Sequence, residues 1–342
     1  MASQMTTITP ERGASLWQRI RHPGHGRDGS KRVFILSAIT PMVLYMAFWT
    51  LLPILWALAL AFFEYSARRQ GGPILGLGGE NPFVGLKHFR NMLDFSEDAS
   101  LEVRQFHISV KTTLMFAFLV VPLNLAITLP LAAMIESVGR AFKIGFRTIF
   151  FLPIVTSSVG VAIMWGYILH PQRGFLNGAL TIINGKLTVI NWTGDASLTV
   201  GFIPVALLAV IIAYLWQDIG YNLLIFIAAL QAIPESIKEA AIIDGANGRQ
   251  LFFHITLPLL KPTIFLASVL TMISAFQVFD IIQVMTRGGP NEQTRVMVID
   301  IYDNAFRFQR MGWAAAVSVV LFVIVLIITL IQNRLLKSEW EY

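Results

Sequence analysis

A long apolar stretch of this chain is interrupted by polar side chains at a helical spacing. They stand at positions i, i+3, i+4 and i+7, and a helix would place all of them on one face: Tyr214, Gln217, Asp218 and Tyr221. Aromatic rings pack against sugar rings, while amide and carboxylate groups hydrogen-bond to hydroxyl groups. This face therefore suits a carbohydrate that moves between helices, and its residues are candidates for a substrate pathway.

A second apolar stretch carries Gln277 and Asp280, which are three residues apart and would also share a helix face. A charge in the middle of a membrane costs roughly 2.5–3.5 kcal/mol on insertion scales, so Asp218 and Asp280 are expected to face a pathway or a partner group. Polar groups also join membrane helices through hydrogen bonds. A substrate pathway and an interhelical contact both stay open for these residues, and Asp280 can also lie at a helix end.

Residues 234–262 read PESIKEAAIIDGANGRQLFFHITLPLLKP, and their turn signals predict a helix, a sharp turn and a second short helix. Pro234 suits the first turn of a helix, where no amide bond is lost. Gly245 supplies the positive φ that ends such a helix, and the Asn247 side chain can cap the next one. Pro258 and Pro262 are expected to halt or bend the chain after it.

Two short helices at an angle would form a rigid knob against which a moving partner could push. The first helix carries Glu239 followed by two alanines, and such small side chains permit a close approach of another backbone. Phe252, Phe253 and Ile255 can anchor the knob to neighbouring helices.

No catalytic or nucleotide-binding pattern accompanies these features. The Gly185-Lys186 pair lacks both the upstream glycine and the following Ser or Thr of a GxxxxGK[ST] phosphate loop. Neither a GxSxG sequence nor a convincing pair of catalytic carboxylates is present, so we expect no catalysis and no cofactor in this chain. Cysteine is absent and the histidines are scattered, which predicts no metal site: His22, His25, His88, His107, His170 and His254.

The composition indicates that most of the surface does not face water. Hydrophobic residues make up 55% of the 342 residues and charged residues 13%, against roughly 25% charged residues in a soluble domain. A membrane crossing needs about 20 apolar residues of helix. Six stretches meet this requirement and predict an all-α membrane protein with six transmembrane helices: 33–63, 112–135, 148–169, 199–233, 263–285 and 313–332.

The first and fourth stretches are longer than one crossing requires, and each could form two short crossings. Pro41 and Pro53 can bend the first, and Gly220 can loosen the fourth. No polar turn interrupts either stretch, so one tilted helix each is the preferred interpretation.

Basic residues indicate the orientation. The net charge is +6, and in a membrane protein such residues mark cytoplasmic flanks rather than nucleic-acid contacts. Arginine and lysine are frequent before the first stretch and rare just after it, which predicts that both termini are cytoplasmic. Residues 16–22 (LWQRIRH) either lie on the anionic inner leaflet or belong to a disordered basic tail. The predicted outside loops are 64–110, 171–198 and 286–312, and the inside loops are 136–147 and 234–262.

The knob also resembles a known sequence block. In type and spacing its residues are similar to the EAA loop of binding-protein-dependent ABC importer permeases: Glu239, Ala240, Ala241, Asp244, Gly245, Ala246, Ile255, Leu257 and Pro258. In that family the loop is the coupling helix that docks on the ATP-hydrolysing subunit. The resemblance implies this role for these residues, and it implies the fold of a type I ABC importer transmembrane domain.

Three further blocks resemble carbohydrate-type permeases of the maltose and glycerol-3-phosphate branch: FVGLKHF at 83–89, ALQAIP at 229–234 and TRGGP at 286–290. Lys87 departs from the acidic residue that the first block often carries. The resemblance implies four segments: a cytoplasmic basic tail (1–32), a first transmembrane helix with a large outside loop (33–108), a permease domain (109–332) and a cytoplasmic tail (333–342).

The resemblance also implies partners: a second homologous permease subunit, a dimer of ATP-binding-cassette ATPases, an extracytoplasmic solute-binding protein, a carbohydrate substrate and membrane lipid, without nucleic acid, in a bacterial or archaeal cell membrane. Import of glycerol-3-phosphate or another non-sugar solute is the main alternative. An ion-driven secondary transporter is disfavoured because the spans hold only two acidic residues and show no evident repeat. A membrane scaffold would not need the polar face of the fourth stretch.

Overall fold

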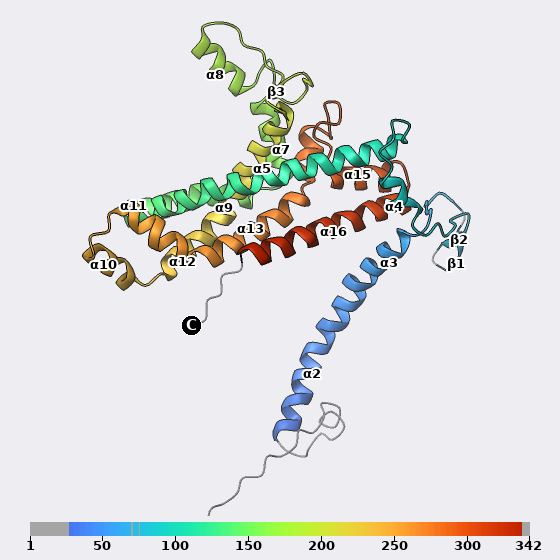
Figure 1. Ribbon diagram of the computed structural model, residues 1–342, viewed down its shortest axis with the longest axis horizontal. Coiled ribbons are helices and arrows are strands. Elements are labelled where there is room, and N and C mark those ends of the chain that lie inside the picture. Colours follow the sequence, from blue (N-terminus) through green and yellow to red (C-terminus); the bar gives the residue numbers. More distant parts are fainter. Residues whose placement is uncertain (1–26, 70, 75, 337–342) are drawn as a thin grey trace, which may run out of the picture. The chain divides into compact units, whose positions relative to one another are not determined.

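The computed structural model describes residues 27–69, 71–74 and 76–336, and the chain divides between residues 57 and 58 into two units that we describe separately. The first is an apolar helical path in which α2 (Arg27–Met46) leads through the π-helical turn η1 (Ala47–Leu51) into α3 (Leu52–Leu60) (Figure 1). Pro53 explains the π-helical turn, because proline has no amide hydrogen and its ring clashes with the carbonyl four residues earlier. The path forms one candidate span, Lys31–Leu60, as predicted. Residues 16–22 lie outside the described residues.

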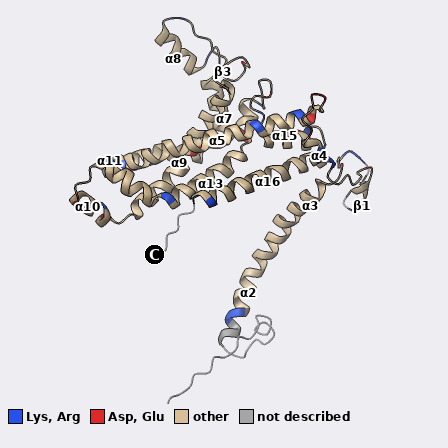
Figure 2. Cartoon of the chain, in the orientation of Figure 1, with Lys and Arg blue, Asp and Glu red and all other residues tan. Residues whose placement is uncertain are grey.

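In the second unit, long helices pack side by side (Figure 1). Here α5 (Leu101–Ser137) packs against α9 (Val205–Ala232) and α13 (Lys261–Phe276). Helix α13 also packs against α16 (Met311–Leu336). Large apolar side chains between them are fully buried, among them Phe116, Leu207, Phe226 and Phe276. The core is therefore formed between helices, while charged residues gather near the helix ends (Figure 2).

The fourth span is one unbroken helix, shorter than the predicted stretch 199–233. Its first residues form a small hairpin of β3 (Thr199–Val200) and β4 (Ile203–Pro204), and α9 begins at Val205. Gly220 does not loosen α9. It lets α6 (Arg140–Val155) approach closely, because a Cβ atom at this position would lie 2.3 Å from the carbonyl oxygen of Phe150.

The third span is broken, so the prediction of one helix over 148–169 is wrong. The axes of α6 and α7 (Ser158–Ile168) differ by 101°, and Thr156 and Ser157 adopt extended backbone between them. Pro153 weakens the last turn of α6, and hydroxyl side chains compete for backbone groups at such a break. The described residues contain five helices long and apolar enough to cross a membrane, or six if this bent pair counts as one span.

The ends of the second unit carry short elements. After α9 come α10 (Glu235–Ile243), α11 (Gly248–Gln250), the π-helical turn η2 (Leu251–Thr256) and α12 (Leu257–Leu259). The opposite end holds β1 (Gly71–Ile74), β2 (Leu77–Gly79), α4 (Lys87–Met92), α15 (Met297–Tyr302) and the π-helical turn η3 (Asp303–Arg307). Two further helices are α8 (Phe175–Asn184) and α14 (Asp280–Met285). Because α5 begins at Leu101, the predicted boundary between residues 108 and 109 lies within a helix.

Candidate functional site

The predicted knob, here called the coupling segment (residues 234–262), turns sharply at Gly245. This residue has φ +85°, and its N–H donates to the carbonyl of Ile242 at 3.0 Å. The next N–H, of Ala246, donates to the carbonyl of Ala241 at 3.0 Å. These two bonds form a Schellman motif, which satisfies the last carbonyl groups of α10. The predicted helix stop is therefore confirmed, and its direction is fixed by backbone hydrogen bonds.

The predicted cap at Asn247 is also confirmed. Its side chain accepts from the backbone N–H of Gln250, and the Gln250 side chain accepts from the backbone N–H of Asn247, both at 2.9 Å. This reciprocal capping box starts a helical path that continues through η2 and α12 into α13. Of the two predicted effects of the prolines, halting or bending the path, the halt is not observed, because Pro258 and Pro262 occupy first turns, where no amide donor is needed. Pro234 lies just before the first turn of α10.

The tip of the coupling segment is exposed and partly apolar. Glu239, Ala240 and Asp244 are exposed, whereas Ala241 is buried. Sequence reasoning missed Ile242 and Ile243, which are 59% and 84% exposed at the end of α10. Two isoleucines next to an aspartate in a polar connection were the available signal. Neighbouring exposed apolar side chains of this kind mark surfaces that another protein or a membrane covers.

The remaining predicted coupling residues hold the base of the segment. Ile255, Leu257 and Pro258 are all half-buried, and Gly245 and Ala246 form the turn itself. Phe253 is half exposed and lies under the guanidinium of Arg249, whose Cζ is 5.9 Å from the ring centroid. The segment therefore combines an exposed tip with a packed base.

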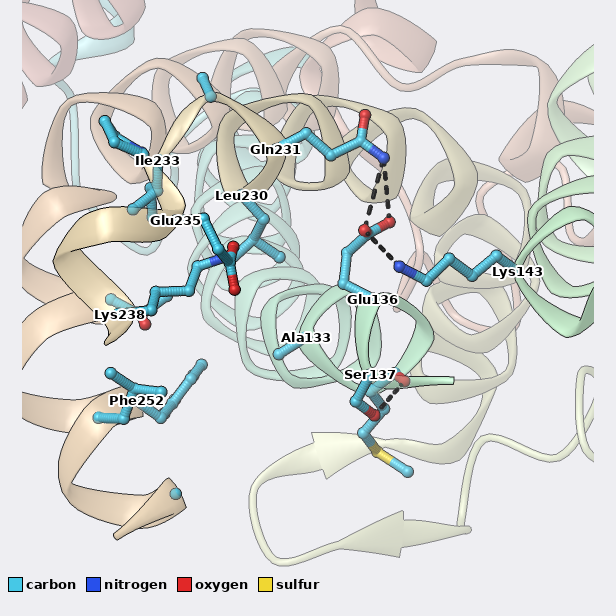
Figure 3. A pocket seen from close by; sticks show the side chains of 16 residues that line it. Ala133, Glu136, Ser137, Lys143, Leu230, Gln231, Ile233, Glu235, Lys238 and Phe252 are labelled. Carbon is cyan, nitrogen blue, oxygen red and sulfur yellow. Dashed lines mark hydrogen bonds and ion pairs between the residues drawn. The ribbon is translucent and has the colours of Figure 1, made fainter. Parts of the chain in front are cut away.

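Behind the coupling segment lies a cavity of about 880 Å³, lined from α5, α6, α9, α10, α11 and η2 (Figure 3). At its edge the Glu136 carboxylate accepts from Lys143 Nζ at 3.1 Å, from Arg147 and from Gln231 Nε2 at 3.3 Å. One carboxylate thus joins the ends of α5, α6 and α9. Sequence reasoning missed Glu136, although an acid at the end of a span followed by basic residues in the next loop was a usable signal.

Glu136→Ala is expected to lower the thermal unfolding midpoint of the purified protein, because Lys143 and Arg147 lose a shared partner whose side chain is only 18% exposed. Hydrogen bonds to charged groups contribute about 1.5–3 kcal/mol each. Glu235→Ala is the matched control in the same cavity. Its carboxylate is 70% exposed and pairs with Lys238, and such surface pairs contribute about 0–1 kcal/mol. Equal shifts for both variants would contradict the role of Glu136.

The structure brings together several of the predicted pathway residues. Tyr214, Gln217, Gln277 and Asp280 line one cavity of about 270 Å³, together with Ser158 and Ser274, which sequence reasoning missed. The Gln217 side chain donates from Nε2 to the carbonyl of Thr156 at 2.9 Å, in the break between α6 and α7. The break in the third span therefore lies beside this cavity, where Ser158 lines it and the Thr156 carbonyl holds Gln217.

Asp218 and Tyr221 lie apart from this cavity. Asp218 Oδ2 accepts from Asn124 Nδ2 at 2.8 Å, and the Asn222 Nδ2 donates to Asn124 Oδ1 and to Thr271 Oγ1, both at 2.7 Å. These groups join α5, α9 and α13, which favours the interhelical interpretation for Asp218. Tyr221 is 44% exposed. Sequence reasoning missed three further polar residues, because the contacts between helices cannot be read from the sequence: Asn124, Asn222 and Thr271.

The 286–312 loop is held by buried charges. Arg295 Nη2 lies 2.9 Å from Asp300 Oδ1, and Arg295 Nη1 lies 3.1 Å from Asp303 Oδ2. Asp303 also pairs with the exposed Arg307 at 3.0 Å. Burial raises the pKa of Asp300 above its usual value, although Arg295 opposes this effect. The backbone N–H of Met297 donates to Thr113 Oγ1 on α5 at 2.8 Å, so the loop is fixed to the helix bundle.

Comparison with known proteins agrees with this architecture. Residues 127–338 match the model of the family described as binding-protein-dependent transport system inner membrane component. The probable ABC transporter permease protein YurN of Bacillus subtilis is 32% identical over 89% of this chain and 96% of its own length. The sn-glycerol-3-phosphate transport system permease protein UgpA of Agrobacterium fabrum is 34% identical over 84% of this chain and 90% of its own.

A solved structure has a similar fold. A chain of a bacterial ABC transporter involved in the import of the acidic polysaccharide alginate superposes with a TM-score of 0.74 and 23% identity, over 95% of this chain and 99% of that one. The sequence relatives, the family match and the bundle of apolar helices have one explanation. The chain belongs to the family of binding-protein-dependent transport system inner membrane components and is a multi-pass permease subunit of an ABC importer.

Proposed function

We propose that this permease forms half of a translocation pore for a carbohydrate, and that a separate ATPase drives it through the coupling segment. The observation that carries the proposal is the fixed turn at Gly245, closed by a Schellman motif on one side and a capping box on the other. A dimer of ATP-binding-cassette subunits docks on the exposed tip formed by Glu239, Ile242 and Ile243. Their closure on ATP moves this tip.

The moving tip displaces the spans because its base is packed against them. From Gly248 the helical path continues into α13, and Glu136 joins the ends of α5, α6 and α9. Gln217 on α9 and Gln277 after α13 line the same cavity, so a displacement of these helices changes the cavity. Alternating access then follows: the cavity opens outward when the ATPases close and inward after hydrolysis.

The cavity favours a neutral carbohydrate. Its described lining includes hydroxyl and amide groups and one carboxylate, Asp280, but no lysine or arginine. An anionic substrate would meet a like charge there without a basic partner. The second candidate is sn-glycerol-3-phosphate, because the UgpA relatives are named for its transport.

The same proposal includes the topology of the chain, its partner proteins and its membrane. Both termini are cytoplasmic, which places the coupling segment on the side of ATP. An extracytoplasmic binding protein delivers the substrate over the loops at 171–198 and 286–312, and a second, homologous permease completes the pore. The membrane is that of a bacterial or archaeal cell. A second solved structure with a similar fold is a bacterial alginate ABC transporter in complex with an alginate pentasaccharide-bound periplasmic protein, which supports the delivery step.

The complete transporter in proteoliposomes tests the proposal. ATP inside, with the binding protein outside, is expected to drive uptake that vanadate inhibits and uncouplers leave unchanged. Neutral saccharides and glycerol-3-phosphate are compared as substrates. Uptake abolished by uncouplers in the presence of ATP would overturn the ATP-driven mechanism, and uptake of glycerol-3-phosphate alone would replace the carbohydrate by the second candidate.

Gln217→Ala and Gln277→Ala are each expected to raise the KM of uptake by about 2- to 12-fold, because one neutral hydrogen bond contributes about 0.5–1.5 kcal/mol. Tyr221→Phe removes only a hydroxyl group that lies outside the cavity, and it should leave KM unchanged. The measurement is initial uptake against substrate concentration in an assembled complex. An effect of Tyr221→Phe alone would move the pathway along α9, away from the cavity and toward Tyr221.

A further inference from the structure

Helix α8 (Phe175–Asn184) turns its polar side toward its own loop. Asn177 is buried, its Nδ2 donates to the carbonyls of Pro171 and Ile190 at 2.8 Å, and its Oδ1 accepts from Trp192 Nε1 at 2.9 Å. One turn later, Thr181 Oγ1 accepts from the backbone N–H of Thr188 at 3.0 Å. The segments before and after α8 therefore satisfy the polar groups of the helix.

The apolar side of the same helix faces outward. Phe175, Ile182 and Ile183 are 77%, 83% and 78% exposed, and Leu187 after the helix is 84% exposed. This arrangement reverses that of a helix on a water-soluble surface, which turns its apolar side inward. The exposed apolar face therefore requires an apolar surrounding.

The level of α8 in the membrane follows from the broken third span. The 16 residues of α6 rise about 24 Å, which is most of a hydrocarbon core about 30 Å thick. The bend of 101° then directs α7 across the bundle, where it packs against α14 at the far end of the fifth span. Helix α8 follows α7 after a short turn and contacts it, so an α6 that starts at one membrane boundary would bring α8 near the other.

Charge supports the same location. The exposed Arg173 and Lys186 flank α8, and residues 171–194 contain no Asp or Glu. Neither basic side chain has an ion-pair partner within the described residues. Basic residues at the margins of an apolar helical face are typical of a helix that lies in a membrane interface.

We propose that α8 is an interfacial helix that binds the outer leaflet, with its apolar face among the acyl chains and Arg173 and Lys186 at the phosphate headgroups. The choice of leaflet rests on the proposed topology. A soluble protein rarely offers a large contiguous apolar patch, and contacts between membrane helices favour small residues. The bulky side chains of Phe175, Ile182 and Ile183 match lipid better than either.

The absence of cysteine makes the test direct, because one introduced cysteine reports from one place. Ile182→Cys is labelled with an environment-sensitive nitrobenzoxadiazole dye and assembled with cysteine-free partners in lipid nanodiscs. Lipids brominated on the upper acyl chain are expected to quench the fluorescence, and aqueous iodide is expected to have little effect. Asn184→Cys, on the polar side of the same helix, is the control and should be quenched by iodide.

Two results would overturn the proposal. Quenching of Ile182→Cys by iodide alone would place the face in water, and protection from both quenchers would mean that the second permease or the binding protein covers it. Labelling at Ile183 instead keeps the test available if the first variant does not assemble. Bromine in both leaflets makes the readout independent of topology, and no substrate or ATP is needed, so failure of the proposed transport function would not produce either result.

Discussion

Replacing Gly245 with valine is expected to reduce uptake by tenfold or more while the chain still inserts into the membrane. Gly245 has φ +85°, a conformation that costs an L-residue roughly 1–2 kcal/mol and a β-branched residue more. The turn between α10 and α11 would relax away from this conformation, and the exposed tip would lose its fixed direction. The ATPase would then bind weakly or move the spans inefficiently.

Gly248→Val is the matched control. At both glycines a Cβ atom would meet no other atom within 4 Å, so neither substitution causes a clash. They differ in backbone conformation, since Gly248 begins α11 and only Gly245 has a positive φ. Co-purification of the ATPase and uptake in proteoliposomes are measured for both. Unchanged uptake with Gly245→Val, or equal losses for both variants, would refute the coupling role of the turn.

The coupling segment could be predicted in detail because its determinants are local. Gly245 ends α10 through bonds to residues a few positions earlier, and Asn247 caps a helix through Gln250, three residues later. Pro258 does not halt the helical path, for an equally local reason. Proline stops a helix only where an amide donor is required, and Pro258 lies in a first turn.

The candidate pathway could be predicted only in part because its geometry depends on other helices. The spacing of Gln217 and Asp218 placed both on one broad face, yet Gln217 meets the break at Thr156 and Asp218 meets Asn124 on α5. Neighbouring residues on a helix differ in direction by about 100°. A shared face therefore does not decide which neighbour each side chain contacts, and the bend after α6 has no periodicity signal that could reveal it.

The buried charges of the 286–312 loop lead to the second large effect. Arg295→Met is expected to destabilise this loop by about 3–5 kcal/mol, because it leaves a buried carboxylate without its partner. Asp300 is fully buried beside Arg295 Nη2 at 2.9 Å, whereas Asp303 keeps the exposed Arg307. Faster proteolysis of the loop and a lower thermal unfolding midpoint are the measurements, and uptake should fall because the binding protein is proposed to dock here.

The pH dependence of this loss of stability tests whether the Asp300 carboxylate causes it. Burial already raises the pKa of Asp300 in the folded protein, so its contribution to stability is favourable at low pH and is lost as the pH rises through the folded pKa. Removing Arg295 removes an interaction that lowers this pKa, so the defect of Arg295→Met should be larger at pH 7.5 than at pH 5. Adding Asp300→Asn should restore most of the stability, because the unpaired charge is then absent. A defect that is equal at both pH values and persists in the double variant would mean that lost packing, not an unpaired carboxylate, destabilises the loop.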